Sequence, residues 1–272
     1  MLTAIALPRL LAGIEQRATR AAAVAGRNAV AARHAAYWWV IISGFFEPVL
    51  YLLSIGVGVG TLVGDFPLPD GGTVSYAAFV APAMLASSAM NGSFNETTLN
   101  FYGKMKFMRL YDGVLATPVT PFEIAVGELM WALARGAVYS AAFLAIMAAM
   151  GLTAPLWALA AFPATVLIGI GFGALGMLIS TFIRSWKDFD YIILMQFALF
   201  LFSGTFAPVE SFPPPLRIVV ELTPLYHGVE LVRNFTTGSP DPAVLGHAAY
   251  LVAIAALGLW AASRRMTALL CK

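Results

Sequence analysis

Hydrophobic residues in this chain form long blocks that are separated by short polar stretches. A helix that crosses a bilayer needs about 20 consecutive, mostly apolar residues, and several of the blocks reach that length. The pattern predicts six membrane spans, over about 36–60, 76–95, 122–150, 157–182, 190–207 and 244–262. The predicted fold class is all-α: a polytopic membrane protein with a single transmembrane domain over 1–272 and a six-span bundle over 36–262.

The composition supports a membrane protein and argues against a nucleic-acid-binding one. Of the 272 residues, 60% are hydrophobic and only 11% are charged, whereas soluble domains carry about 25% charged residues. The formal net charge is +2, which is too small to predict a nucleic-acid partner. Cys271 is the only cysteine, so an intrachain disulfide cannot form.

Basic residues gather on alternate sides of the predicted spans. Thirteen of the 16 lysines and arginines lie before the first span, between the second and third, between the fourth and fifth, or after the sixth. They are Arg9, Arg17, Arg20, Arg27, Arg33, Lys104, Lys106, Arg109, Arg184, Lys187, Arg264, Arg265 and Lys272. Because basic loops stay cytoplasmic, both chain termini are predicted to face the cytoplasm.

The first 35 residues predict an amphipathic helix rather than a secretory signal, because arginines interrupt any apolar core. At 100° per residue one face is polar, with Arg9, Gln16, Arg20, Arg27 and His34. The other face is apolar, with Leu7, Leu11, Ile14, Ala18 and Ala25. We expect this helix to lie in the membrane interface with its arginines facing lipid phosphates. A mitochondrial transit peptide is the alternative, but the segment contains no serine.

Acidic residues interrupt two of the predicted spans. Glu47 lies inside the first span and is followed by Pro48. A charge at mid-bilayer costs about 2.5–3.5 kcal/mol on insertion scales, so such a residue faces a cavity or the protein interior. Two interpretations stay open: a polar contact on a substrate path, or a structural glutamate that joins helices or lies near the interface. Glu123 and Glu128 are expected to mark the cytoplasmic interface. An intramembrane Glu128–Arg135 contact stays open, but it would be strained.

Glycine motifs do not predict a nucleotide site on this chain. Gly171–Gly176 matches the spacing of a dinucleotide fingerprint, but no strand precedes it, so the structural context fails. Gly169 and Gly173 instead predict a face for close helix packing. The chain also lacks a G-x-x-x-x-G-K-[ST] loop, so ATP would have to bind a partner.

Metal and catalytic chemistry are not predicted either. The three histidines are scattered and show no ligand spacing: His34, His227 and His247. No nucleophile–base constellation stands out, so the chain is not expected to be an enzyme.

The longest predicted cytoplasmic loop carries a hydrophobic face. Phe101, Met105 and Met108 recur at i, i+4 and i+7, and methionine-rich faces often serve as adaptable contact sites. Three basic neighbours are expected to stay solvated: Lys104, Lys106 and Arg109. The alternative is an interfacial helix that simply continues the second span.

The segment after the fifth span is unusual for an outer loop. The apolar run halts near Phe202, passes through Pro208 and Pro213–Pro215, and becomes apolar again over Leu216–Leu222. That piece is too short to cross a bilayer, and Pro224 ends it. Broken helices at membrane depth occur where they are buried in protein or line a cavity.

Two stretches carry a resemblance to a known family. The inner loop that runs into "DGVLATPVTPFEIAVGE" and the outer "SGTFAPVESFPPPLRIVVELTPLYHGVELVR" resemble the permease of a type 2 ABC exporter. Within that family the chain is most similar to the NodJ-like branch, which is associated with lipooligosaccharide and drug export. The resemblance covers nearly the whole chain, and the outer signature is its specific part.

The resemblance implies a bacterial inner-membrane protein with several partners. It implies a second permease, identical or related, and two copies of a separate ATP-binding subunit that docks from the cytoplasm. ATP and Mg²⁺ would bind that subunit, with no cofactor on this chain. It also implies an elbow helix over 1–35, a coupling helix over 96–112, and two re-entrant helices within 208–235, at about Pro213–Leu222 and Leu225–Phe235.

Candidate site residues fall into three groups. For contact with the ATP-binding subunit we expect Asn100, Phe101, Lys104, Met105, Lys106, Met108 and Arg109. For the substrate path, from position alone, we expect Phe46, Glu47, Phe197, Phe200 and Phe206. For an outer gate we expect Pro208, Glu210, Pro224, Tyr226, His227 and Glu230.

The predicted function is ATP-driven export of an amphipathic or lipid-linked substrate, which enters laterally between the first and fifth spans. Two rivals remain. A proton-coupled secondary transporter would use Glu47, although no inverted repeat is evident. A membrane-embedded enzyme or an assembly scaffold is disfavoured by the lack of a catalytic constellation.

Overall fold

The computed structural model describes residues 2–34, 49–67, 73–238 and 240–270. Among these residues the one sheet is an antiparallel hairpin of β1 (Asp65–Pro67) and β2 (Thr73–Ser75). The α-helices are α1 Leu2–His34, α3 Gly60–Val63, α4 Tyr76–Asn95, α5 Leu110–Leu115, α6 Pro121–Ala149, α7 Pro155–Ser180, α8 Asp188–Leu201, α9 Pro214–Glu221, α10 Pro224–Thr236 and α11 Ala243–Leu270. Short π-helical stretches lie at Ser54–Val59, Glu96–Asn100 and Gly103–Phe107, and a 3₁₀ turn at Val209–Ser211.

The predicted all-helical class is confirmed. Within the described part of the chain, three helices are long and apolar enough to cross a membrane: α6, α7 and α11. They coincide with the third, fourth and sixth predicted spans, and α4 coincides with the second. The first predicted span falls in part on 35–48, outside the described residues. Six spans therefore remain a prediction.

The fifth predicted span is longer than the helix at its place. The prediction ran to residue 207, but α8 ends at Leu201. Gly204 then has a φ of 73°, a left-handed conformation that glycine adopts without strain. The Thr205 hydroxyl donates to the Phe200 carbonyl at 2.8 Å. This bond satisfies one of the carbonyl groups that have no partner at the end of a helix. The chain therefore turns out of the helix six residues earlier than its apolar pattern predicts.

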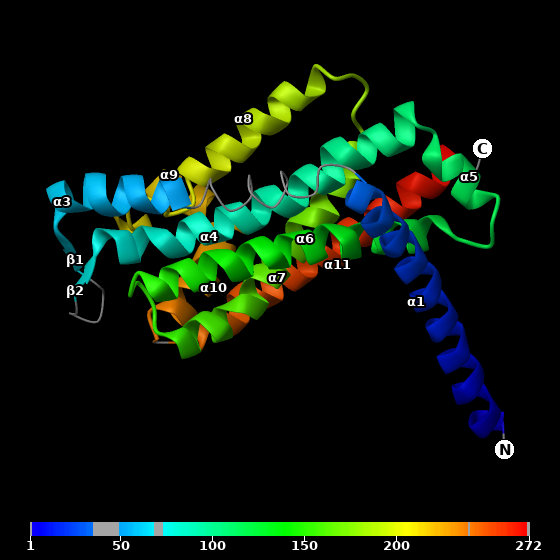
Figure 1. Ribbon diagram of the computed structural model, residues 1–272, viewed down its shortest axis with the longest axis horizontal. Coiled ribbons are helices and arrows are strands. Elements are labelled where there is room, and N and C mark those ends of the chain that lie inside the picture. Colours follow the sequence, from blue (N-terminus) through cyan, green and yellow to red (C-terminus); the bar gives the residue numbers. More distant parts are fainter. Residues whose placement is uncertain (1, 35–48, 68–72, 239, 271–272) are drawn as a thin grey trace.

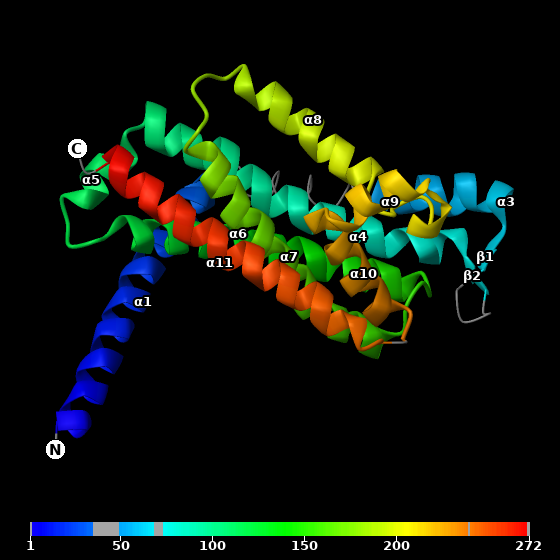
Figure 2. The same cartoon turned by 180° about the vertical axis from the view of Figure 1, so that it is seen from behind.

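The long helices run side by side in one bundle, with two exceptions (Figures 1 and 2). α8 begins away from the bundle and approaches it toward its end near α9, and α1 projects away from one end. That end also carries α5 and the C-terminal part of α11. We call it the basic end, because the loops with Lys104, Lys106, Arg109, Arg184 and Lys187 lie there. The hairpin, α9 and α10 lie toward the opposite end.

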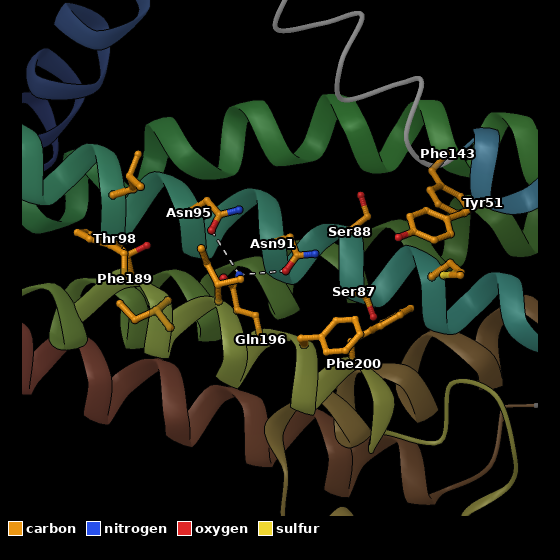
Figure 3. A pocket seen from close by; sticks show the side chains of 15 residues that line it. Tyr51, Ser87, Ser88, Asn91, Asn95, Thr98, Phe143, Phe189, Gln196 and Phe200 are labelled. Atoms are coloured by element: carbon orange, nitrogen blue, oxygen red, sulfur yellow. Dashed lines mark hydrogen bonds between the residues drawn. The ribbon is translucent and has the colours of Figure 1, made fainter. Parts of the chain in front are cut away.

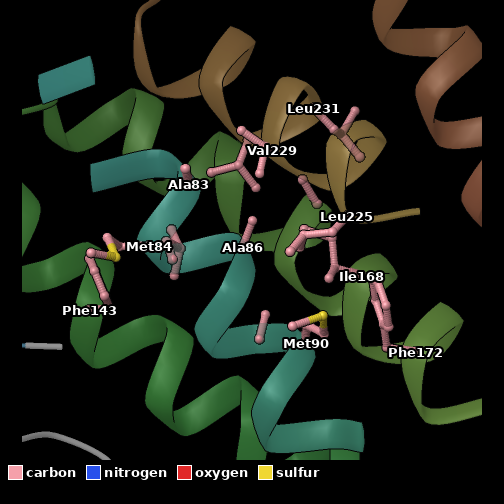
Figure 4. Close-up of a cluster of buried hydrophobic side chains, with 14 of the residues drawn as sticks. Ala83, Met84, Ala86, Met90, Phe143, Ile168, Phe172, Leu225, Val229 and Leu231 are labelled. Carbon is pink, nitrogen blue, oxygen red and sulfur yellow. The ribbon is translucent and has the colours of Figure 1, made fainter. Parts of the chain in front are cut away.

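A core of apolar side chains joins α4, α6, α7 and α10 (Figure 4). Met90 of α4, Ile168 of α7 and Leu225 of α10 are all buried. Phe94 and Phe172 meet edge to face, with ring centroids 6.5 Å apart. α10 is thus a buried part of the bundle, not an ordinary surface loop.

Glycines let α7 approach its neighbours closely, as predicted for Gly169 and Gly173. A Cβ atom at Gly169 would lie 2.8 Å from Ser93 Oγ of α4. A Cβ at Gly173 would lie 2.5 Å from Leu129 Cδ1 of α6. One turn further on, a Cβ at Gly176 would overlap the Thr97 hydroxyl. Small residues at helix crossings allow this backbone approach inside a membrane.

Substitution of Gly176 with alanine is expected to lower the thermal unfolding midpoint of the purified protein. The Thr97 hydroxyl that the new methyl group meets is held by its own hydrogen bond to Ser93 O, at 2.9 Å. Overpacking of this kind costs about 1–3 kcal/mol. Gly246→Ala is the matched control, because a Cβ there has no neighbour within 4 Å. Equal midpoints for the two variants would contradict the packing assignment.

α1 packs against α6, and this corrects the expectation that Arg20 and Arg27 face lipid phosphates. A Cβ at Gly127 of α6 would lie 2.5 Å from the Ala21 carbonyl oxygen, so the two backbones nearly touch there. Arg20 Nη1 donates to the Pro118 carbonyl at 2.8 Å. Arg27 Nη2 donates to Glu128 Oε1 at 3.1 Å. Both arginines therefore lie against protein, because buried carboxylates of α6 attract them.

The two short helices expected after α8 are present. α9 covers most of 213–222, and α10 begins at Pro224, the first position of a helix, where the missing N–H of proline costs nothing. Thr223 caps α10 by accepting a hydrogen bond from Tyr226 N at 3.4 Å. The Thr223–Pro224 hinge predicted from sequence is therefore the break between the two helices.

Candidate functional site

A cavity of about 540 Å³ lies between α4 and α8, where α8 separates from the bundle (Figure 3). We call it the α4–α8 groove. Polar side chains line its α4 wall and the stretch that follows: Ser87, Ser88, Asn91, Asn95 and Thr98. Aromatic and aliphatic side chains line its α8 wall: Phe189, Ile192, Ile193, Phe197 and Phe200. The groove thus offers a hydrogen-bonding surface on one side and an apolar surface on the other.

Three amide side chains bridge the groove. Gln196 Nε2 of α8 donates to Asn91 Oδ1 at 3.0 Å and to Asn95 Oδ1 at 3.4 Å (Figure 3). Asn91 and Asn95 are one turn apart, so they share a face of α4. An amide carries both donors and acceptors. This cluster can therefore bind hydroxyl or amide groups of a ligand, whichever way they point.

Phe197 and Phe200, two of the residues predicted for a substrate path, line the groove. Phe206 does not line it, but its ring packs against Phe200 with centroids 5.3 Å apart. Phe46 and Glu47 lie outside the described residues. Sequence reasoning missed the amide cluster. A usable signal was the spacing of Asn91 and Asn95 within an otherwise apolar helix.

A charged network lies where α4 runs into the basic end. Lys104 Nζ donates to Glu128 Oε2 at 2.6 Å and lies 3.8 Å from Glu96 Oε1. Arg135 Nη1 donates to Glu96 Oε2 at 2.5 Å. Arg27 pairs with the other Glu128 oxygen. The two carboxylates are almost fully buried, and buried charges of this kind must be paired.

This network excludes one contact that the sequence left open and corrects one expectation. Glu128 and Arg135 do not pair with each other, because each has closer partners on neighbouring segments. Lys104 is not solvated: its side chain is only 16% exposed and ties the loop after α4 to α6. Glu123 is buried as well, and it accepts from Thr120 N at 2.8 Å in a capping box at the start of α6.

The predicted coupling segment is partly internal, which corrects its expected contact face. Phe101 and Met105 are buried, because the segment folds over α6, α7 and α11. Phe101 packs on Tyr111 with ring centroids 5.2 Å apart. The same burial and the charge of Glu128 raise the pKa of Tyr111, so the phenol stays protonated. Met108, in contrast, is 72% exposed.

The rest of this segment faces outward. Lys106 and Arg109 are exposed. Arg109 has a φ of 45°, which breaks the helical path before α5, so the segment is not one continuous helix. Asn100 is exposed too, although it donates to Glu96 Oε2 at 2.7 Å.

An exposed aromatic patch joins the two loops at the basic end. Phe107 and Trp186 stack with centroids 5.4 Å apart and are 60% and 50% exposed. Tyr102 and Phe189 support them from beneath at 5.3 to 5.8 Å. We call Phe107, Met108 and Trp186 the aromatic patch. Sequence reasoning missed it, although a tryptophan between basic residues in a short loop was a usable signal.

The residues predicted for an outer gate lie together around α9 and α10. Pro208 precedes the turn Val209–Ser211, which contains the exposed Glu210. Pro224 begins α10. Tyr226 and His227 follow in its first turn, and Tyr226 is half-buried beside Glu230, which raises its pKa to about 12.

Arg233 links three segments around α10. Its Nη1 donates to Glu230 at 2.5 Å, and its Nη2 donates to the Gly204 carbonyl at 2.8 Å. The guanidinium lies 4.3 Å from the Phe79 ring centroid of α4, within the range of a cation–π contact. One side chain thus connects α10, the loop after α8, and α4.

The structure brings together two of the histidines that are far apart in the sequence. His227 and His247 are not scattered, because α10 and α11 pack side by side and bring the two rings within hydrogen-bond distance. The described residues contain no group of three or more His, Cys, Asp or Glu that could hold a metal ion.

Known proteins are similar to this chain over most of its length. The family described as "ABC-2 type transporter" matches residues 29–235. Nodulation protein J of Rhizobium leguminosarum bv. trifolii is 33% identical over 226 residues, which cover 83% of this chain and 84% of that protein. Nodulation protein J of Rhizobium meliloti (strain 1021) is 32% identical over 201 residues, 74% and 75% of the two chains. This chain therefore belongs to the ABC-2 type transporter family, as a membrane permease similar to nodulation protein J.

Proposed function

We propose that this chain is the permease subunit of an ATP-driven exporter of amphipathic, lipid-linked molecules, with a lipooligosaccharide as the leading substrate class. The observation that carries the proposal is the α4–α8 groove. Its amide cluster suits a headgroup rich in hydroxyl and amide groups, and its phenylalanine wall suits an acyl chain. Similarity to proteins named nodulation protein J supports the same class of substrate.

The energy source is a separate subunit. ABC-2 membership implies an ATP-binding partner, and the chain has no phosphate-binding loop of its own. Two copies of that subunit and a second permease, identical or related, complete the transporter, and the subunit supplies ATP and Mg²⁺. Its docking site here is the aromatic patch. Exposed aromatic residues are typical anchors of protein interfaces, and the patch lies at the basic, cytoplasmic end of an inner-membrane protein.

Movement of the docked subunit reaches the helices through the charged network. The aromatic patch begins three residues after Lys104, and Lys104 holds carboxylates on two segments, Glu128 of α6 and Glu96 beyond α4. A push on the loop therefore displaces α6 and the end of α4 together, and α4 forms one wall of the groove. Release of the substrate on the outer side requires α9 and α10 to move. The contacts of Arg233 resist that movement until the groove opens.

Gln196→Leu is expected to reduce ATP-dependent transport of a fluorescent lipooligosaccharide into inside-out vesicles by about 5-fold or more. The substitution removes both hydrogen bonds across the groove, and each is worth about 0.5–1.5 kcal/mol. Leu194→Ala is the control, since Leu194 lies on the same helix but does not line the groove. Equal transport by both variants would place the substrate elsewhere. The absence of ATP dependence in the unmodified complex would overturn the exporter assignment itself.

A further inference from the structure

Two histidines from different helices face each other through their Nδ1 atoms. His227 lies on α10 and His247 on α11, and their Nδ1 atoms are 2.8 Å apart. The ring of Tyr250 stacks on His227 with centroids 3.9 Å apart. Tyr226 meets both imidazoles edge-on at 5.5 and 5.9 Å. The aromatic neighbours thus hold the two rings in this orientation.

The arrangement is close to that of two ligands on one metal ion. A hydrogen bond between two Nδ1 atoms needs a proton on one and a lone pair on the other. Zinc binds imidazole nitrogen at about 2.0–2.1 Å with tetrahedral geometry, which places two such nitrogens about 3.3 Å apart. The rings need to separate by only about 0.5 Å to admit an ion in place of the shared proton.

We propose that His227 and His247 form a binding site for a divalent transition-metal ion, such as Zn²⁺, Ni²⁺ or Cu²⁺, that joins α10 to α11. Neutral imidazole is the ligand form. Because the described residues provide no third His, Cys, Asp or Glu, water completes the coordination. The ion therefore exchanges with solvent, and Cu²⁺ binds most tightly in the usual order of affinities.

The site has a structural consequence that does not depend on the transport proposal. Tyr250 donates from its hydroxyl to the Leu222 carbonyl at 2.6 Å, so the α11 segment around His247 is already linked to the end of α9. A bound ion adds a second link, between α10 and α11. Metal binding is expected to stabilise the packing of these helices, since an ion that binds only the folded state raises its stability.

The test is calorimetry. The full chain is purified in mild detergent with a tag that lacks histidine and is then titrated with Ni²⁺ or Zn²⁺. We expect one ion per chain at pH 7.5, a higher thermal unfolding midpoint, and weaker binding at pH 5.5 because protons compete for the same nitrogens. His227→Asn and His247→Asn should each weaken binding at least about tenfold, since even the loss of an outer partner has that effect. His34→Asn is the control.

His247→Cys keeps the proposal testable if an asparagine variant fails to fold. A thiolate preserves a ligand and shifts preference toward softer ions, so this variant should still bind Zn²⁺. Absence of binding at 1 mM metal, or equal binding by the unmodified chain and the His227→Asn/His247→Asn double variant, would overturn the proposal.

Discussion

Glu128→Leu is expected to destabilise the protein by about 3–5 kcal/mol, because removal of one partner from a buried ion pair leaves the other charge unpaired. Glu128 accepts hydrogen bonds from Arg27, Asn28 and Lys104 at 2.6 to 3.1 Å. Leucine fills the space but leaves the lysine without its closest counter-charge in a site that is only 16% exposed. The expected result is a large fall in the folded fraction recovered from detergent after heating, measured by size-exclusion chromatography.

Glu221→Leu is the matched control for this experiment. Glu221 also forms an ion pair, with Arg217 at 2.6 Å, but both side chains of that pair are well exposed. Exposed pairs of this kind contribute little to stability, so the control should recover like the unmodified chain. If Glu128→Leu recovered equally well, the network would not hold α1, the loop after α4, and α6 together.

The paired substitution Phe107→Glu with Trp186→Glu is expected to weaken binding of the ATP-binding subunit by about 30-fold or more. Central aromatic residues of an interface each contribute about 2 kcal/mol or more, and 2 kcal/mol corresponds to about 30-fold in affinity. Both side chains are exposed, so the permease should fold normally. The measurement is the affinity between the two purified subunits in detergent.

Two further variants serve as controls for the position of the charge and for loss of folding. Met150→Glu places the same charge on an exposed methionine at the opposite end of α6 and should leave the affinity unchanged. Phe101→Asp should instead reduce the amount of folded protein, because Phe101 is fully buried. Unchanged affinity in the Phe107/Trp186 variant would exclude the aromatic patch as the docking site.

The sequence predicted the elements of this fold better than their contacts. The bounds of α4 and α6 follow from apolar blocks, and the break between α9 and α10 follows from Pro224. Such signals act over a few residues, so a single sequence contains them. The end of α8 was placed too late because the predicted span included Phe206 and Ala207, whereas the conformation of Gly204 and the Thr205 hydrogen bond stop the helix earlier.

The site depended on contacts between distant segments, which the sequence alone does not contain. Gln196 meets Asn91 across 105 residues, and Arg27 meets Glu128 across 101. The periodicity of Phe101 and Met105 indicated a hydrophobic face correctly. It could not tell whether that face meets a partner or the rest of the chain.

The most direct test of the proposed function is a pull-down of this chain from its native membrane in mild detergent, with the eluate assayed for bound protein and for ATP hydrolysis. The exporter assignment predicts a separate ATP-binding subunit in the eluate, active with Mg²⁺ and lost when Phe107 and Trp186 are changed to glutamate. A chain that elutes alone in folded form, without ATP hydrolysis, and that transports substrate on a proton gradient would contradict it.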